Sequence, residues 1–321
     1  MQVPAADPAN LSSDARRGSR VRAERHETME FFNGHHTVKV RGNTRFPGPL
    51  TALPLPDGPP DTETAVQAMY DDGYVIFPGL LNANGVALLR ARMDAMGSRN
   101  DDDYVVEGWC YNKHIASDFS QNPDLLDYID LPGVVDVLEV IHGGDAHLNA
   151  NPGPQVIGGS SWITGAGRDM GIHTDYQSYH LPEEVHEAYR LPIYCTTLHI
   201  YLNDLTPELG PTILIPGSHR AGRPPEDEWS WKGRNPQAAL VKAGDALLFR
   251  NDIWHGAWKN THPTERRYMM QVHYAHGSFG KCYPSLRYPQ LYAPEVLAKA
   301  TPRQRRLLGE RPPRGGVAPK Y

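Results

Sequence analysis

Short apolar segments of strand length, separated by glycine and proline, make up much of the chain after about residue 146. The chain holds 30 glycines and 29 prolines, and the segments are 155–163, 194–202, 212–215, 246–249 and 267–275. Several short strands over roughly 130 residues are typical of an antiparallel sandwich or jelly roll. We therefore expect a mainly β fold with flanking helices, in which residues far apart in sequence meet at one open mouth.

Helical patterns precede this region. Residues 62–70 predict a short helix, followed by a strand at 74–77 that Pro78 ends. Asn84 can cap a second helix that Gly97 ends, and a third helix runs from Pro132 to about Gly143. We expect these helices to brace the β core from outside.

The two ends of the chain differ from the middle. Residues 1–60 carry eight prolines and five arginines between 16 and 25, with little apolar periodicity, which predicts a flexible or surface-wrapped extension. An apolar patch at 29–34 could dock on the domain. We expect a jelly-roll oxygenase-sized domain with N-terminal bracing helices at 61–290, and a C-terminal helix and tail at 291–321.

Composition limits the partners. A net charge of −5 gives no electrostatic reason for a nucleic-acid partner, and no apolar run approaches the roughly 20 residues of a membrane helix. The three cysteines, Cys110, Cys195 and Cys282, are scattered, which disfavours a thiolate metal site and fits a reducing compartment. Cytoplasm is the default expectation, and a homo-oligomer is compatible with these features.

A histidine and a carboxylate two residues apart stand at His173 and Asp175. His255 follows 82 positions after His173, and Arg266 follows 11 positions after His255. Two histidines and one carboxylate form the facial triad of non-heme Fe(II) oxygenases, which leaves coordination positions open. Other histidines, such as His199 and His273, are more often hydrogen-bonded structural residues than ligands.

Strand alternation addresses the two adjacent arginines. Arg266 shares a face with Tyr268, Met270, Val272 and Tyr274. Arg267 and every second residue after it share the other face. Because the first face is the more apolar, we expect it to point into the barrel. An inward guanidinium needs an anion, which is either a bound carboxylate or an internal salt-bridge partner.

Several segments occur in an order that resembles a known family. They read YDDGYVIFPGL at 70–80, NDLTPELGPTILIPGSHR at 203–220 and KAGDALLF at 242–249, and they stand in order with His173, Asp175, His255 and Arg266. Over roughly 64–280 the chain resembles the phytanoyl-CoA dioxygenase-like branch of the Fe(II)/2-oxoglutarate oxygenases. The resemblance implies a double-stranded β-helix of the cupin-like, jelly-roll kind.

The resemblance also implies the chemistry. His173, Asp175 and His255 would bind Fe(II), and Arg266 would bind the far carboxylate of 2-oxoglutarate. Dioxygen would be consumed, succinate and CO2 released, and a C–H bond of a small molecule oxidised, with hydroxylation as the expected outcome. Asp175 is present, whereas halogenating relatives replace this carboxylate, so chlorination is disfavoured.

Two further positions concern the cosubstrate. Thr196 is a candidate hydroxyl for it, although a threonine in a strand often only suits the pleat. Many relatives carry a serine two residues after the distal histidine, where it contacts the cosubstrate. Here that position is Ala257, so another group would have to supply that hydrogen bond.

Substrate identity has weaker signals. Aromatic and polar residues that could line a pocket occur at 109–113, 176–180, 229–231 and Trp258, and they suit a small molecule, for example of secondary metabolism. An acyl-CoA hydroxylase is an alternative, although no compact basic cluster stands near the site. Two others are a cupin-like metalloenzyme that uses the triad without 2-oxoglutarate, and a non-catalytic binding module.

Overall fold

The computed structural model describes residues 28–32, 37–41, 48–95, 112–116, 119, 121–143, 153–167, 169–176, 181–277 and 293–309. The strands are β1 (Thr28–Phe32), β2 (Thr37–Arg41), β3 (Thr51–Ala52), β4 (Tyr74–Phe77), β5 (Asn112–Ala116), β6 (Pro154–Thr164), β7 (Met170–His173), β8 (Cys195–Tyr201), β9 (Thr212–Leu214), β10 (Gln237–Ala238), β11 (Ala246–Arg250), β12 (His255–Ala257) and β13 (Arg267–His276). The helices are α1 (Thr62–Asp71), α2 (Ala83–Ala95), η3 (Pro123–Tyr128), α3 (Val134–His142), α4 (Glu183–Ala188), η5 (Ser218–Ala221), α6 (Pro294–Lys299) and α7 (Pro302–Leu307).

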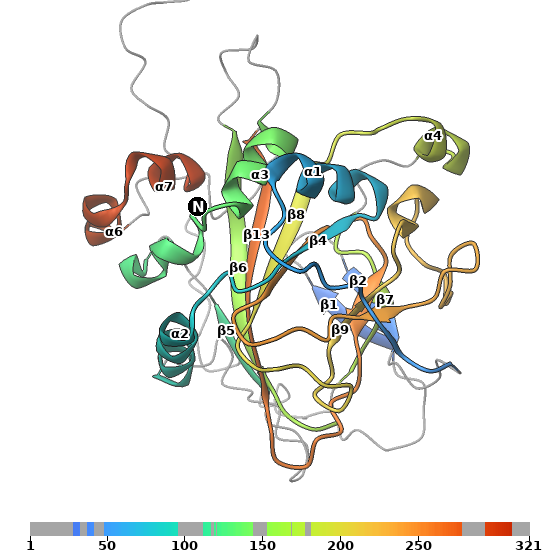
Figure 1. The fold of residues 1–321 in the computed structure, drawn as a ribbon, viewed down its shortest axis with the longest axis horizontal. Helices are drawn as coiled ribbons and strands as arrows, with labels where there is room; N and C mark the ends of the chain where they lie inside the picture. The colour runs from blue at the N-terminus through green and yellow to red at the C-terminus, as the bar shows by residue number, and fades with distance from the viewer. Residues whose placement is uncertain are drawn as a thin grey trace, which may run out of the picture.

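Two sheets form a jelly roll (Figure 1). One has six strands in the order β4-β11-β8-β13-β6-β5, and all its neighbouring strands are antiparallel. The other has five strands in the order β3-β10-β9-β12-β7, in which β3 runs parallel to β10 and the other pairs are antiparallel. From β6 to β9 and again from β10 to β13, consecutive strands alternate between the sheets, which brings residues far apart in sequence together. The predicted mainly β, double-stranded β-helix fold is confirmed.

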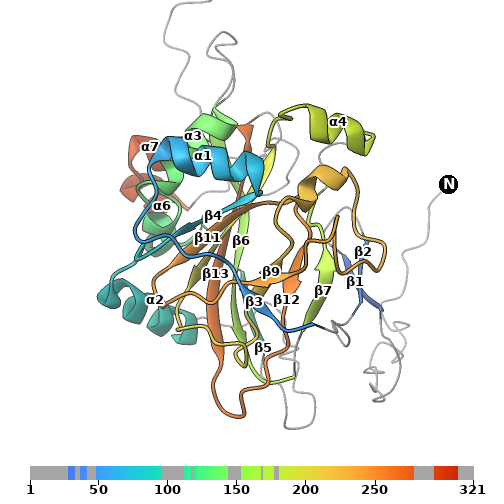
Figure 2. The same ribbon diagram turned by 45° about the vertical axis from the view of Figure 1, so that its right-hand side comes forward.

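The six-stranded sheet has a different environment on each face. Helices α1, α2, α3, α6 and α7 cover the face that points away from β7, β9 and β12 (Figure 2). Buried apolar side chains of α1, α3 and α7 pack there against alternate residues of the sheet, including Leu198, Ile200, Met270 and Val272. The opposite face looks toward the five-stranded sheet, where Tyr201, Leu214, Phe249 and Met269 share a second apolar cluster. Side chains that reach the inside of the barrel must therefore come from this second face.

The helices begin where the sequence offers caps. The side chain of Asp61 accepts a hydrogen bond from the Thr64 amide at 2.7 Å, at the start of α1. In α7, Thr301 and Gln304 form a capping box. The structure describes no helix with the length and apolar character that crossing a membrane requires.

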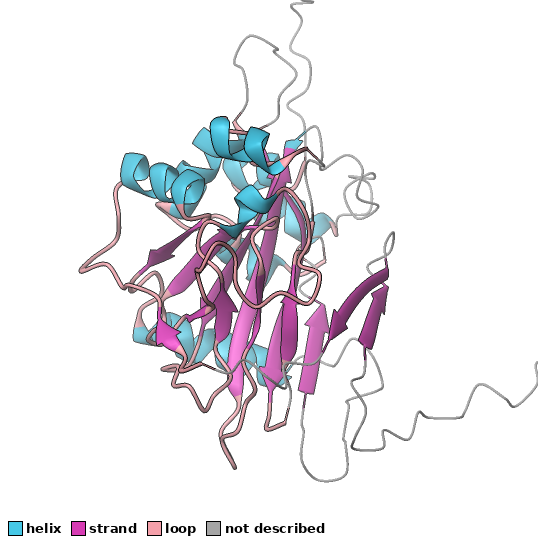
Figure 3. Cartoon of the chain, turned by 90° about the vertical axis from the view of Figure 1, so that its right-hand side faces the viewer, coloured by secondary structure: helices cyan, strands magenta, loops and turns pink. Residues whose placement is uncertain are grey.

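The N-terminal region contributes strands to the domain edge. β1 and β2 pair as an antiparallel hairpin, and β2 lies beside β7 at the open side of the five-stranded sheet (Figure 3). β3 pairs with β10. Part of the extension predicted at 1–60 thus runs along the edge of the sheet that carries His173 and His255, while the boundaries at residues 60 and 290 stay predictions.

Candidate active site

His173 and His255 lie side by side on neighbouring strands. They are register partners between β7 and β12, and their ring centroids are 4.4 Å apart. Gly256 permits this approach, since a Cβ at that position would stand 2.6 Å from the carbonyl oxygen of Met170 and 2.8 Å from that of Gly171. Only a glycine therefore fits directly after His255, at the end of the Asp252–Gly256 stretch.

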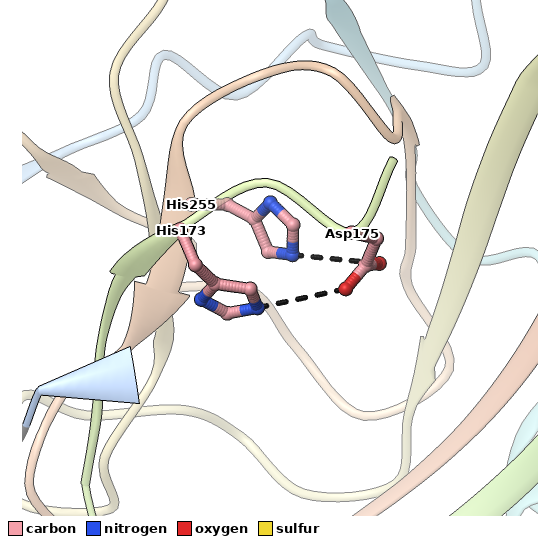
Figure 4. A group of neighbouring side chains, drawn as sticks. All are labelled: His173, Asp175 and His255. Atoms are coloured by element: carbon pink, nitrogen blue, oxygen red, sulfur yellow. Dashed lines mark ion pairs between the residues drawn. The ribbon is translucent and has the colours of Figure 1, made fainter. Parts of the chain in front are cut away.

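Asp175 completes a group of three donors at the end of β7 (Figure 4). Its Oδ1 lies 3.5 Å from His173 Nε2, and its Oδ2 lies 3.6 Å from His255 Nε2. One ligand atom from each residue falls within 4.8 Å of the other two. The structure thus brings together the three residues that the sequence predicts as metal ligands.

Backbone carbonyls orient both imidazoles. Nδ1 of His173 lies 2.8 Å from the Gly171 carbonyl, and Nδ1 of His255 lies 2.9 Å from the Ile253 carbonyl. Because a carbonyl only accepts, each Nδ1 carries a proton, so the neutral form of each ring has its lone pair on Nε2, the nitrogen on the side of Asp175. This is the arrangement in which histidines bind metals, with the second ring nitrogen held by a backbone acceptor.

Electrostatics favour a cation at this point. Burial opposes the ionisation of Asp175, but the charge and hydrogen bonds of His255 and His173 outweigh it, and the pKa of the carboxyl lies well below its ordinary value. Burial alone lowers the pKa of His255, yet Asp175 and the Ile253 carbonyl raise it above its ordinary value. Two nitrogen donors and one carboxylate oxygen suit ferrous iron, so the residues present fit this metal.

A buried ion pair holds the turn between β11 and β12. Nε and one terminal nitrogen of Arg250 lie 2.7 and 2.8 Å from the two carboxylate oxygens of Asp252, and their side chains are only 4% and 3% exposed. Between them, the carbonyl of Asn251 accepts hydrogen bonds from the amides of Asp175 and Tyr176 at 3.0 and 3.2 Å. The turn thereby fixes Asp175 relative to His255.

Replacing Asp252 with asparagine is expected to lower the free energy of unfolding by about 3–5 kcal/mol, because it leaves a buried guanidinium without its counter-charge. Urea unfolding measures this loss. Glu228→Gln is the matched control, because it breaks the Arg223–Glu228 pair, whose side chains are 40% and 37% exposed. That change should cost at most about 1 kcal/mol, and equal losses in the two variants would contradict the proposed difference.

The inward orientation predicted for Arg266 is wrong. Arg266 is exposed and lines a surface hollow of about 470 Å³ together with Arg90 and Tyr268, on the outside of the six-stranded sheet. Arg267 is 6% exposed and shares the inner face of β13 with Met269. The more apolar face of β13 packs against the helices, because helices cover that side, and the more polar face lines the barrel.

Thr196 faces away from the candidate site, in contrast to the prediction. It is fully buried, and its Oγ1 lies 3.1 Å from Nε2 of His142 on α3. It shares its side of β8 with Leu198 and Ile200, which belong to the helix-covered cluster. Its neighbour Thr197 has the opposite orientation and therefore faces the barrel interior.

A polar network that the sequence did not predict lines the inner face of β8 and β13. The Gln271 side-chain oxygen accepts hydrogen bonds from Ser160 Oγ at 2.7 Å and Trp162 Nε1 at 3.0 Å. Its amide nitrogen therefore donates to His199 Nε2 at 2.8 Å, and His199 Nδ1 lies 3.3 Å from both Thr212 Oγ1 and Tyr201 Oη. Burial lowers the pKa of His199 well below its ordinary value, with His255, His273 and Arg267 acting in the same direction.

Of the residues predicted to line a pocket, some lie in the core and others are half-buried. Trp231 is 6% exposed and packs with Ile215 and Trp254 in a small apolar cluster, so it belongs to the core. Tyr176 and Trp258 are half-buried. Residues 109–111 and 177–180 lie outside the described residues, as do the side chains at 112–113.

Sequence comparisons identify related proteins. The model of the phytanoyl-CoA dioxygenase family matches residues 69–268, which is more than half of the chain. An ectoine dioxygenase of Stutzerimonas stutzeri is 23% identical over 244 residues, covering 65% of this chain and 75% of the relative. Dioxygenase cdmA of Talaromyces verruculosus is 22% identical over 285 residues, covering 84% of this chain and 89% of the relative.

Solved structures share the fold. The α-ketoglutarate-dependent epimerase SnoN from nogalamycin biosynthesis superimposes with a TM-score of 0.51 at 18% identity, covering 67% of this chain and 83% of SnoN. HygX from Streptomyces hygroscopicus, solved with nickel, 2-oxoglutarate and hygromycin B, gives a TM-score of 0.51 at 14% identity, covering 66% of this chain and 86% of HygX. Because the family model matches more than half of its length, the chain belongs to the phytanoyl-CoA dioxygenase family of Fe(II)/2-oxoglutarate-dependent oxygenases.

Proposed function

We propose that the protein hydroxylates a C–H bond of a small molecule, with 2-oxoglutarate and dioxygen as cosubstrates and succinate and CO2 as products. The observation that carries this proposal is the grouping of His173, Asp175 and His255, whose ligand atoms lie within 4.8 Å of one another between two strands of the barrel. The retained carboxylate of Asp175 favours oxygen transfer to the substrate.

His173, Asp175 and His255 would hold Fe(II) as three ligands and leave coordination positions for the two cosubstrates. When bound, iron and 2-oxoglutarate together supply the oxidation chemistry. The chain contributes the positions of its ligands, which the Gly171, Ile253 and Asn251 carbonyls fix. It also buries the two histidines, whose side chains are 9% and 6% exposed, whereas the Asp175 side chain is 30% exposed, so water is limited on the histidine side.

Arg267, in place of Arg266, is our candidate for binding the far carboxylate of 2-oxoglutarate. Its guanidinium donates to the carbonyl of Gly210, two residues before Thr212. It shares the inner face of β13 with Gln271, which belongs to the inner-face network, and its charge lowers the pKa of both His199 and Tyr201. A guanidinium has five donors in a fork that matches a carboxylate, so a bond to one carbonyl is compatible with carboxylate recognition.

Thr212 can supply the hydroxyl that Ala257 lacks. The two residues are register partners between β9 and β12, so their side chains leave the sheet on the same face. Thr212 is 2% exposed, and its Oγ1 lies 3.3 Å from His199 Nδ1. We propose that the Thr212 hydroxyl donates to the cosubstrate beside Arg267.

Thr212→Val should weaken 2-oxoglutarate binding about 10-fold, because a hydrogen bond to a charged group contributes roughly 1.5 kcal/mol or more. Adding Ala257→Ser to this variant should restore most of the affinity, since the serine lies directly across the strand pair. Isothermal titration calorimetry with the metal-loaded protein measures both. If the double variant binds 2-oxoglutarate as weakly as Thr212→Val does, a hydroxyl at position 257 cannot replace the one at position 212, and the proposed role of Thr212 is refuted.

We propose that the substrates are small molecules and that the protein acts in the cytoplasm. The relatives act on or are solved with compounds of this class, as the names ectoine dioxygenase and the hygromycin B complex of HygX state. The half-buried aromatic side chains of Tyr176 and Trp258 support an apolar wall, and the net charge of −5 gives no electrostatic reason to propose a nucleic-acid partner.

Coupled turnover tests the proposed function. Fe(II)-loaded protein incubated with 2-oxoglutarate in air should release succinate above the rate of an Asp175→Ala variant, and a small-molecule screen should raise that rate for the true substrate. Consumption of oxygen without succinate would favour a metalloenzyme that uses the triad without 2-oxoglutarate. If the protein consumes no oxygen and releases no succinate with any compound of the screen, the proposed oxygenase function is refuted.

A further inference from the structure

A second hydrogen-bonded chain lies on the inner face of the six-stranded sheet, separate from the network around Gln271. Thr197 Oγ1 donates to the side-chain oxygen of Asn251 at 2.9 Å and lies 2.9 Å from Nδ1 of His273. Thr197 is fully buried, and Asn251 is 5% exposed. Asn251 is also the residue whose backbone carbonyl holds the amide of Asp175.

The direction of the hydrogen bonds fixes the tautomer of His273. A threonine hydroxyl has one proton, and that proton goes to the Asn251 carbonyl oxygen, which only accepts. The oxygen of Thr197 must then accept from His273, so Nδ1 carries the ring proton. Burial lowers the pKa of His273, although Asp175 opposes this, which favours the neutral ring, and with the proton on Nδ1 the Nε2 of that ring is an acceptor.

His273 lies close to the metal ligands. Its hydrogen-bond partner Thr197 contacts Asn251, whose backbone carbonyl accepts from the Asp175 amide at 3.0 Å, so Thr197 and Asn251 link His273 to the ligand Asp175. It shares the inner face of β13 with Arg267, on the far side of Gln271, and it is half-buried. Among the residues that the structure describes, none forms a hydrogen bond with His273 Nε2, whereas Nδ1 bonds to Thr197.

We propose that His273 Nε2 accepts a hydrogen bond from an O–H or N–H group of the substrate, and that Thr197 and Asn251 keep this nitrogen unprotonated. The proposal rests on the proposed function and narrows its substrate class. The preferred substrate is an alcohol, amine or amide whose donor group stands a few bonds from the oxidised carbon. A buried acceptor left unpaired is costly, so an analogue without the donor binds less well.

The tautomer is measured directly by NMR of ¹⁵N-histidine-labelled protein, loaded with Zn(II) and 2-oxoglutarate. We expect a protonated Nδ1 and an unprotonated Nε2 for His273 in the wild type and in Thr197→Ser, and a mixture of tautomers in Thr197→Val. Thr196→Val is the matched control, because Thr196 is equally buried on the same strand but contacts His142. A protonated Nε2 in the wild type would overturn the proposal.

Substrate recognition is tested with a panel of small alcohols and their methyl ethers, of which cyclohexanol and cyclohexyl methyl ether are one pair. Binding to the same Zn(II)–2-oxoglutarate protein is followed by ligand-observed NMR. The wild type should bind its best alcohol roughly 3- to 10-fold more tightly than the matched ether, the range that one neutral hydrogen bond gives. His273→Phe should abolish the preference, and Thr196→Val should retain it.

The outcomes separate the two levels of the proposal. No binding of any alcohol, or the same preference in His273→Phe, would overturn the role of His273. Cosubstrate binding is monitored in Fe(II)-loaded samples of the same variants by their charge-transfer absorption. If the wild-type protein shows no charge-transfer absorption, the proposed function is refuted. If it shows the absorption but does not prefer the alcohol to the ether, only the role of His273 is refuted.

Discussion

Replacing His255 with alanine should abolish stoichiometric Fe(II) binding and, with it, 2-oxoglutarate turnover. His255 contributes one of two nitrogen donors, and its Nε2 is turned toward Asp175 by the bond between Nδ1 and the Ile253 carbonyl. Changes to residues that merely orient a metal ligand cost 10–100-fold in affinity, so loss of the ligand itself should cost at least about 100-fold. Anaerobic equilibrium dialysis with Fe(II) measures the change.

A histidine outside the site provides the control for His255→Ala. His262 lies seven residues further along the chain, and its ring accepts hydrogen bonds from the amides of Thr264 and Glu265. His262→Ala should leave Fe(II) affinity unchanged. Tight, stoichiometric iron binding by His255→Ala would show that the metal is held elsewhere.

The adjacent arginines offer the second large effect. Arg267→Met should weaken 2-oxoglutarate binding by about 2–4 kcal/mol, roughly 30- to 1,000-fold, because it removes the buried cation that we propose as the partner of the cosubstrate carboxylate. Arg266→Met should change the affinity by less than about 2-fold, because Arg266 is exposed on the outer face. Titration of the Fe(II)-loaded variants with 2-oxoglutarate gives both values.

Two further measurements separate binding from folding. Arg267→Lys keeps the charge but loses the planar fork, so it should bind 2-oxoglutarate with intermediate affinity. Thermal unfolding without cosubstrate shows whether loss of the bond to the Gly210 carbonyl destabilises the fold itself. Weak binding by Arg266→Met together with normal binding by Arg267→Met would restore the assignment made from the sequence.

The longer strands could be predicted because burial leaves a readable pattern over many residues. The segments at 155–163 and 267–275 correspond to β6 (Pro154–Thr164) and β13 (Arg267–His276) within one residue at each end. The strands that carry the histidines, β7 and β12, have only four and three residues, too few for a period of two to be recognised. Their positions depend on pairing between distant segments.

The metal grouping could be predicted from residue types and order, whereas the cosubstrate residues could not. Which face of a strand lines the barrel depends on what covers the other face, and helices cover one face of the six-stranded sheet. The rule that the more apolar face points inward therefore selected Arg266, when Arg267 faces the interior. Thr196 was selected only as a hydroxyl on a strand, and it lies on the helix-covered face, whereas Thr197 faces the interior. The polar character of the opposite face, Arg267, Gln271 and His273, was the available signal.

Absorption of the anaerobic protein tests the central claim most directly. Fe(II) alone should give no visible band, and addition of 2-oxoglutarate should produce a metal-to-ligand charge-transfer band that saturates when protein, iron and cosubstrate are equimolar. Arg267→Met should require far more 2-oxoglutarate to reach the same intensity. No band with the wild-type protein, at concentrations that saturate iron binding, would contradict a site built from His173, Asp175 and His255 for iron and 2-oxoglutarate.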